Sequence, residues 1–248
     1  MSSVFKSYSH YYDLLYKDKD YDKETKYIQS ILNSQNISNG NLLEFGSGTG
    51  IHGKLLAKND YKVHGIELSE EMVAKAGTSL GFSCQIGDIS TVKMNRFYDA
   101  VLSLFHVISY QITNDKLKAV FENASSHLNR GGLFLFDFWY SPAVLKQKPV
   151  VRVKRMANNK VEITRIAEPE IFSSENRVDV NYTIYVHDLT KDTIHVFKET
   201  HSMRHFSLSE IDILADACGF QRIKAEEFVT GHLPSDSTWG VCVVLKKI

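Results

Sequence analysis

The chain has 248 residues, and its 29 Lys and Arg balance 29 Asp and Glu, so its formal net charge is zero. A nucleic-acid partner usually requires a basic surface, so this composition disfavours that class of function. No stretch approaches the roughly 20 apolar residues of a membrane span, and the N-terminal stretch lacks the apolar core of a signal peptide. Cys84, Cys218 and Cys242 show neither disulfide nor zinc spacing, which favours a reduced cytoplasmic protein.

The first part of the chain alternates helical patterns with short apolar runs. Helical spacing, capping residues and terminal glycines predict helices over 22–35, 51–59, 69–80 and 114–132. Short apolar runs predict strands over 41–45, 61–68, 82–88, 97–105 and 133–139. Strands that alternate with helices indicate a parallel sheet with helices on both faces.

The pattern changes after Pro149. Between residues 150 and 206 polar and apolar residues alternate with a period of two, which predicts antiparallel strands. A capped helix over 207–219 and two closing strands over 221–228 and 239–247 follow. We therefore predict an α/β, doubly wound domain formed by residues 1–149 and 207–248, with an antiparallel β platform inserted at 150–206.

A glycine-rich loop follows the first predicted strand, in the stretch LLEFGSGTG at 42–50. A strand, a glycine turn and a helix form a cradle for an anion or nucleotide, although a tight turn without a ligand is the alternative. Gly46, Gly48 and Gly50 have the spacing G-x-G-x-G, whereas dinucleotide sites have G-x-G-x-x-G. Glu44 precedes them and would repel a pyrophosphate but attract an ammonium or sulfonium group. S-adenosylmethionine carries both cations.

Two more acids stand at the ends of predicted strands. Glu67 ends the second strand and can accept hydrogen bonds from ribose hydroxyls. Asp88 ends the third strand and is placed to accept from an adenine amino group, with Ile89 available to the ring. Alternatively, Glu67 is a charge at a helix N-terminus and Asp88 a turn residue. Three acids on one rim favour the binding interpretation.

These motifs, in this order, resemble the class I S-adenosylmethionine-dependent methyltransferases. The segments that carry the resemblance are LLEFGSGTGIHGKLL, VHGIELSEEMV, CQIGDIS, YDAVLSLFHVISY and LNRGGLFLFDFW. The resemblance implies that Glu44 and the glycines lie along the methionine moiety, that Glu67 binds the ribose, and that Asp88 and Ile89 bind the adenine. It also implies a seven-stranded sheet in the order 3-2-1-4-5-7-6, with strand 7 antiparallel.

Within this superfamily the chain is most similar to the N-methyltransferases of nucleotide-linked 3-aminosugars. The similarity lies in residues 104–110 and 137–142, in N-terminal Tyr-Asp and Lys-Asp-Tyr pieces, and in matching histidines at His52 and His201. It implies further cofactor contacts from Tyr12, Tyr21, His52, Leu68 and Phe105. His106-Val107 stands where those enzymes have Ser-Ser, and Phe138 where they have Pro, so the acceptor contacts differ.

The acceptor is expected to be a small molecule, because the segment after the fourth strand lacks the Asn/Asp-Pro-Pro-Tyr motif of base methyltransferases. An amine acceptor must lose a proton, and His106 and Tyr110 are the candidate catalytic residues for that step. Weaker candidates for the acceptor pocket are Trp139, Tyr140, Arg204 and His205. Scattered histidines predict no metal. An O-methyltransferase and a non-catalytic cofactor-binding protein are the alternative functions, and no nucleic acid or membrane is expected as a partner.

Overall fold

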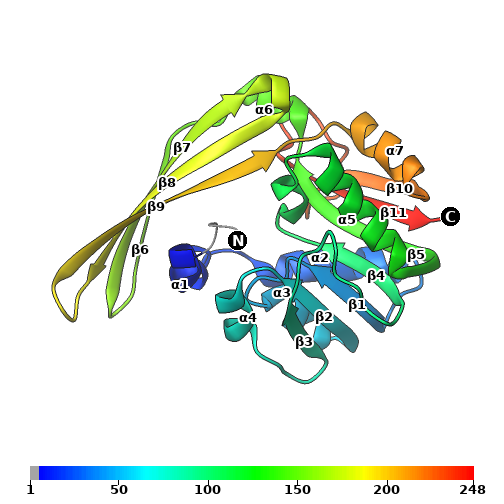
Figure 1. The fold of residues 1–248 in the computed structure, drawn as a ribbon, viewed down its shortest axis with the longest axis horizontal. Helices are drawn as coiled ribbons and strands as arrows, with labels where there is room; N and C mark the ends of the chain where they lie inside the picture. Colours follow the sequence, from blue (N-terminus) through cyan, green and yellow to red (C-terminus); the bar gives the residue numbers. More distant parts are fainter. Residues whose placement is uncertain (1–5) are drawn as a thin grey trace.

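A computed structural model describes residues 6–248, with side chains from Tyr11 onward. Its central element is a seven-stranded sheet in the order β10-β11-β5-β4-β1-β2-β3 (Figure 1). The strands are β1 (Gly40–Phe45), β2 (Tyr61–Glu67), β3 (Phe82–Ile86), β4 (Tyr98–Ser103), β5 (Leu128–Trp139), β10 (Phe220–Glu227) and β11 (Gly240–Lys247). Strand β11 is antiparallel to both of its neighbours, and β1 to β5 are parallel. The predicted strand order is therefore confirmed.

Two helical layers cover the sheet because successive side chains of a strand point to opposite faces. Leu43 packs in a cluster with α5 (Asn114–Ser126) and α7 (Leu208–Ala217). Its neighbour Leu42 packs in a second cluster with α2 (Tyr21–Ser34), α3 (Ile51–Ala57) and α4 (Glu70–Ala76). Both faces of the parallel strands are buried, and this explains why their sequences are apolar almost throughout.

The segment after Pro149 forms a second sheet in the order β6-β7-β8-β9, antiparallel throughout. Its strands are β6 (Arg152–Ala157), β7 (Val161–Phe172), β8 (Arg177–Asp188) and β9 (Thr193–Arg204). They lie within the predicted platform at 150–206, and the division into domains stays a prediction. Figure 1 shows this sheet arching over the carboxyl ends of β1 and β2.

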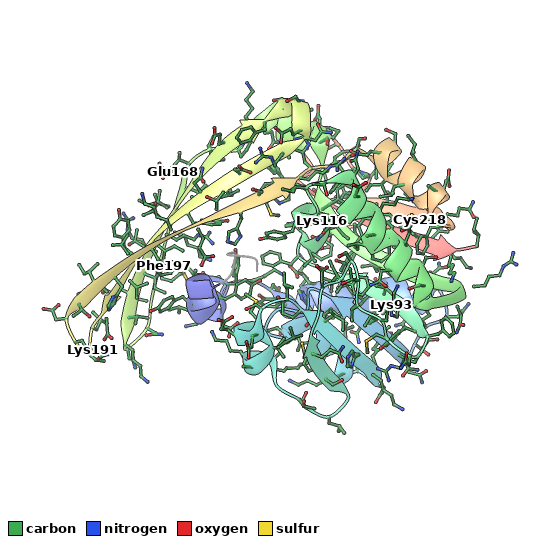
Figure 2. The ribbon with its side chains drawn as sticks, in the orientation of Figure 1. Lys93, Lys116, Glu168, Lys191, Phe197 and Cys218 are labelled. Atoms are coloured by element: carbon green, nitrogen blue, oxygen red, sulfur yellow. The ribbon has the colours of Figure 1, made fainter. Side chains whose placement is uncertain are left out.

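The platform is fastened by two apolar clusters. Leu15, at the end of α1 (Lys6–Leu15), packs against Ile163 and Ile184. Tyr11 stacks on Phe197 of β9, with ring centroids 6.1 Å apart (Figure 2). At the other end, α6 (Ser141–Gln147) packs against β8 and β9 through a cluster around Val144. Helix α1 thereby lies between the platform and the main sheet.

The sequence pattern missed some local structure. Helices α1 and α6 and the 3-10 turns η1 (Val107–Tyr110) and η2 (Ser173–Glu175) were not predicted. The helix predicted over 114–132 is wrong in its last part, because α5 ends at Ser126 and β5 already begins at Leu128, which pairs with Tyr98. No helix in the described part of the chain is long and apolar enough to cross a membrane.

Candidate functional site

A cavity of about 940 Å³ lies between the carboxyl ends of the parallel strands, the segment after α1 and the platform. A volume of this size accommodates a cofactor-sized ligand. The predicted site residues that line the cavity are Tyr12, Tyr21, Glu44, Gly46, Gly48, His52, Glu67, Leu68, Asp88, Ile89, Phe105, His106 and Tyr110. Gly50 is the exception. It faces away from the cavity, and a Cβ on it would lie 2.6 Å from the Phe82 ring.

The glycine loop adopts left-handed backbone conformations at all three glycines. The φ angles are 69° at Gly46, 55° at Gly48 and 76° at Gly50, a region that other residues rarely adopt. A Cβ on Gly46 would lie 2.5 Å from the side chain of Val107. The loop is thus shaped by close approach to the segment after β4 as well as by its own turn.

Glu44 is buried at the end of β1, with 2% of its surface exposed. Its Oε2 has no hydrogen-bond partner among residues 6–248. Burial, and then the charge of Glu67, raise the pKa of Glu44 to about 8, although a hydrogen bond from the Gly53 backbone offsets part of this. A buried carboxyl group with one unpaired oxygen at a cavity wall is the environment in which a cationic ligand gains most.

Glu67 joins the glycine loop to the start of α4. One carboxylate oxygen accepts from the Gly48 N–H and the other from the Ser69 N–H, both at 2.9 Å. Burial raises the pKa of Glu67, and these backbone hydrogen bonds oppose the shift. Each oxygen keeps a further lone pair that can accept from a ligand hydroxyl.

Asp88 and Ile89 follow β3 at the same rim. Oδ1 of Asp88 accepts from the Ser90 N–H at 2.8 Å and from the Ser90 hydroxyl at 2.6 Å. Asp88 therefore is a turn residue, and this fixed orientation leaves its second oxygen for another donor. Ile89 is 8% exposed and belongs to the core cluster that contains Leu43. It also lines the cavity.

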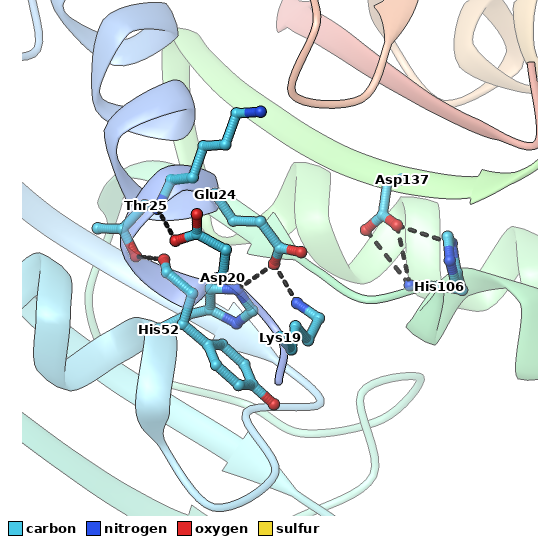
Figure 3. Close-up of polar contacts among 9 residues, drawn as sticks. Lys19, Asp20, Glu24, Thr25, His52, His106 and Asp137 are labelled. Carbon is cyan, nitrogen blue, oxygen red and sulfur yellow. Dashed lines mark hydrogen bonds and ion pairs between the residues drawn. The ribbon is translucent and has the colours of Figure 1, made fainter. Parts of the chain in front are cut away.

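On the side of α2, the ammonium group of Lys19 lies between two aromatic rings, Tyr21 and Phe105, which line the cavity. The Lys19 Nζ lies 4.3 Å from the Tyr21 ring centroid and 4.4 Å from that of Phe105, within the range of cation–π attraction. Lys19 also pairs with Glu24, whose Oε2 lies 2.7 Å from the His52 Nε2 (Figure 3). Burial lowers the pKa of both Lys19 and His52. The segment between α1 and α2 is thereby tied to the helix that follows the glycine loop.

His106 follows β4 in a left-handed conformation, with φ 62°, directly after Phe105 at φ 64°. The backbone N–H of His106 donates to Asp137. The Nδ1 of His106 lies 2.7 Å from Asp137 Oδ2, which is an ion-pair distance, but the angle at this contact is not that of a hydrogen bond (Figure 3). Burial would raise the pKa of Asp137, but the charge and hydrogen bonds of His106 outweigh it and lower that pKa. An ionised carboxylate thus orients the imidazole at the cavity wall.

Tyr110 ends the 3-10 turn η1, and its hydroxyl lies 2.8 Å from Nδ1 of His201 on β9. Burial raises the pKa of the Tyr110 phenol well above its usual value. The phenol therefore stays protonated at neutral pH and acts as a hydrogen-bond donor.

The weaker acceptor candidates divide into two groups. Trp139 lines the cavity. Tyr140, Arg204 and His205 lie outside its wall: Arg204 pairs with Glu210, and His205 is fully buried with its Nδ1 2.8 Å from the Ser141 hydroxyl. Burial lowers the pKa of His205 to about 4, which fits a neutral structural imidazole.

Sequence reasoning missed Asp137, Lys19 and Glu24 as parts of the site. Asp137 could have been found, because it lies near the carboxyl end of a parallel strand, as do the three acids that were predicted. Lys19 belongs to the Lys-Asp-Tyr piece of the family similarity but was not predicted to take part in the site, and Glu24 carries no signal of its own. Within residues 6–248 no group of three or more His, Cys, Asp or Glu side chains gathers as a metal site would require, and the absence of a metal stays a prediction.

Alanine substitutions at Gly46 and Gly48 separate two causes of destabilisation, a steric clash of the new Cβ and a strained backbone conformation. Gly46→Ala should lower the free energy of unfolding by about 2–4 kcal/mol, because it adds both a clash with Val107 and backbone strain. Gly48→Ala, whose Cβ would meet nothing nearer than Met72 Sδ at 4.0 Å, should lose about 1–2 kcal/mol. Urea denaturation measures both, and adding Val107→Ala should recover part of the Gly46→Ala loss. Equal losses without recovery would contradict the packing described for Gly46.

The raised pKa of Glu44 predicts pH-dependent ligand binding. A cationic ligand binds the carboxylate form, which is scarce below the pKa of about 8. The affinity for S-adenosylhomocysteine should therefore rise by roughly tenfold or more from about pH 6 to about pH 8, with release of a proton on binding. Calorimetry in buffers of different ionisation enthalpy measures both quantities. Glu44→Gln should bind more weakly and without this pH dependence, and an affinity that falls with pH would refute the assignment.

Comparisons with known proteins agree with this site. Residues 42–132 match the family model of a methyltransferase domain. A dTDP-3-amino-3,4,6-trideoxy-alpha-D-glucopyranose N,N-dimethyltransferase of Streptomyces venezuelae is 27% identical over 215 residues, covering 85% of this chain and 88% of the relative. A dTDP-3-amino-3,6-dideoxy-alpha-D-glucopyranose N,N-dimethyltransferase of Streptomyces fradiae is 26% identical over 176 residues, covering 70% and 69%.

A solved structure shares the whole fold. An amino pentose methyltransferase from Micromonospora echinaspora, solved with bound S-adenosylmethionine, superposes with a TM-score of 0.76 at 21% identity. The superposition covers 100% of this chain and 99% of that one. The matched methyltransferase domain and the two named relatives support methyl transfer that depends on S-adenosylmethionine, and the superposition shows that the chain shares the fold of the solved structure.

Proposed function

We propose that the chain transfers a methyl group to the amino group of a nucleotide-linked aminosugar. The observation that carries this proposal is a single large cavity in which the predicted cofactor residues and two candidate proton acceptors, His106 and Tyr110, share one wall. The two Streptomyces relatives, whose names state dTDP-linked 3-aminosugars as substrates, support it. The cytoplasmic location expected from the sequence stays a prediction.

The cofactor is assigned to the rim of the sheet. Glu44 and the glycine loop would hold the methionine moiety, because Glu44 is a buried carboxyl group that lines the cavity and an ionised carboxylate there attracts a cation. Glu67, with both oxygens held by backbone N–H groups, would accept from the ribose hydroxyls. Asp88 and Ile89 would meet the adenine. S-adenosylmethionine supplies an activated methyl group on its sulfonium.

The transfer itself asks little of the protein. Methyl transfer is an in-line displacement with a neutral leaving group, so most of the rate enhancement can come from positioning the acceptor in a site cleared of water. The amine must present its lone pair, which requires the removal of a proton. His106, oriented by Asp137, and Tyr110 are the residues on the cavity wall that would orient the amine and receive this proton.

Two cations suit the nucleotide part of the acceptor. Lys116 on α5, labelled in Figure 2, and Arg152 on β6 both line the cavity. Lysine and arginine are the side chains that bind phosphate groups through charge-assisted hydrogen bonds. A diphosphate between the sugar and the nucleoside would therefore find two positive charges at the edge of this cavity.

The acceptor assignment is tested by transfer of a labelled methyl group. The panel is dTDP-3-amino-3,6-dideoxy-α-D-glucopyranose, the same sugar with a 3-hydroxyl group, and the free aminosugar. We expect label on nitrogen, with the nucleotide-linked amine as the best acceptor. Label on oxygen alone would favour the O-methyltransferase alternative. Cofactor binding without transfer to any compound of the panel would favour the non-catalytic alternative.

The role of the two cations gives a second prediction. Lys116→Ala and Arg152→Ala should each raise the KM for the nucleotide-linked amine by about tenfold, which is the loss of one charge-assisted contact of about 1.4 kcal/mol. The KM for the free aminosugar should stay unchanged, because it carries no phosphate. Lys118→Ala is the matched control, since Lys118 lies on the same helix and pairs with Glu122 at 3.3 Å outside the cavity. Equal effects on both acceptors would contradict a diphosphate contact.

A further inference from the structure

A chain of contacts runs from the cavity into the platform. The Tyr110 hydroxyl, at the cavity wall, lies 2.8 Å from Nδ1 of His201. The other ring nitrogen of His201, Nε2, lies 3.4 Å from Oε2 of Glu199. The side chains of His201 and Glu199 are 4% and 7% exposed. Tyr110 and His201 both line the cavity, and Glu199 lies behind them, so a buried phenol, imidazole and carboxyl group follow one another.

The chemistry of the three groups sets the direction of these contacts. An ionised carboxylate only accepts hydrogen bonds, so an ionised Glu199 assigns the proton of His201 to Nε2. The Nδ1 of a neutral imidazole is then the acceptor, and the Tyr110 hydroxyl donates to it. The order of the groups is that of a catalytic triad, in which a base activates a nucleophile and an acid orients the base. Here the Tyr110 phenol takes the place of the nucleophile, His201 that of the base and Glu199 that of the orienting acid.

The proposed amine substrate must lose a proton, and these contacts provide a route for that proton. An ordinary amine arrives as an ammonium ion at neutral pH and has no lone pair until it loses a proton. Tyr110 cannot accept this proton as a phenolate, because burial raises its pKa well above the usual value. It can accept the proton only if its own proton leaves at the same time, and His201 Nδ1 is the acceptor within reach.

We propose that Tyr110, His201 and Glu199 form a relay that removes one proton from the acceptor ammonium before methyl transfer. The inference rests on the proposed amine acceptor. The ammonium N–H bond breaks and leaves its electron pair on nitrogen, and a new O–H bond forms on Tyr110. The original Tyr110 O–H bond breaks, and its proton binds to Nδ1 of His201. The resulting imidazolium faces the Glu199 carboxylate, and no other reactant is needed.

In this relay Tyr110 contacts the acceptor, and His201, which also lines the cavity, acts on the acceptor through Tyr110. Glu199 does not line the cavity and is a positioning residue that acts through His201. The charged and titratable groups around them come from several elements. Tyr182 of β8 packs edge-on against the His201 ring with centroids 4.9 Å apart, and Arg165 of β7 lies over Tyr182 and Tyr16. Glu67 also acts on Tyr110 through its charge.

The decisive test is the pH dependence of turnover with dTDP-3-amino-3,6-dideoxy-α-D-glucopyranose. At about pH 7, His201→Gln should lower kcat by about a hundredfold, the usual size of a general-base effect. At about pH 10 the amine is already neutral, so kcat of His201→Gln should approach that of the parent enzyme. Affinity for S-adenosylhomocysteine should stay unchanged. Tyr110→Phe removes only the hydroxyl and should show the same profile, so the test does not depend on the folding of one variant.

His195→Gln is the matched control, because His195 is an exposed histidine on the same strand. It should keep the parent profile. A deficit in His201→Gln that is constant across pH, or a raised KM with kcat preserved, would overturn the relay and leave only an orienting role. A parent enzyme that methylates no amine would overturn the proposed function and the relay together.

A second measurement tests the hydrogen-bond chain without any acceptor. Nitrogen-15 NMR of the parent protein with S-adenosylhomocysteine should show His201 protonated on Nε2 and unprotonated on Nδ1. Tyr110→Phe should shift the Nδ1 signal, because it removes the hydroxyl that donates to that nitrogen, and Glu199→Gln should shift the Nε2 signal, because it replaces the carboxylate next to that nitrogen. A proton on Nδ1 in the parent would overturn the relay even if the aminosugar is methylated.

Discussion

The site depends on a carboxyl group that the fold buries without a full set of partners. Glu44 lies one residue before the end of β1, an inner strand of the sheet, and one of its oxygens finds no donor among residues 6–248. Its pKa is raised to about 8, so the neutral form is favoured in the free protein. The folded state consequently loses stability as pH rises from the ordinary pKa of a carboxyl group toward about 8, because ionisation is then opposed by burial. A bound cation would offset the free-energy cost of ionising the buried Glu44. Ligand binding should therefore stabilise the folded protein most at a pH where Glu44 is ionised.

The rim around Glu44 is built by the parallel topology, and its far wall by the platform. Parallel strands bring their carboxyl ends to one edge, where Glu44, Glu67 and Asp88 stand in line. The platform covers this edge and adds side chains from β8 and β9 to the same cavity. A site between two layers is closed to water more completely than a crevice at the end of one sheet, which suits a displacement that depends on alignment of the reactants.

Two consecutive residues with left-handed backbone lie where the layers meet. Phe105 and His106 are consecutive residues in the left-handed region, an uncommon conformation for residues other than glycine. The buried carboxylate of Asp137 accepts from the His106 backbone and contacts its ring, so a single side chain holds both the strained turn and the imidazole. Close approach of Gly46 to Val107 fixes the same turn from the other side. The turn after β4 is thereby held against both the glycine loop and β5.

Much of this protein follows from local sequence. Alternating apolar runs and helical patterns predicted a parallel sheet and an antiparallel platform, because burial on two faces and on one face leave different periodicities. The order of the seven strands came from the family resemblance. Acids at strand ends predicted Glu44, Glu67 and Asp88 as one group, since parallel strands gather those ends at one edge. The tertiary structure alone decided which distant groups meet. Tyr110 and His201 are 91 residues apart, and His106 and Asp137 are 31 apart, and no local pattern encodes such contacts. The early start of β5 was decided in the same way, because Leu128 pairs with Tyr98 of β4, a residue that is distant in the sequence.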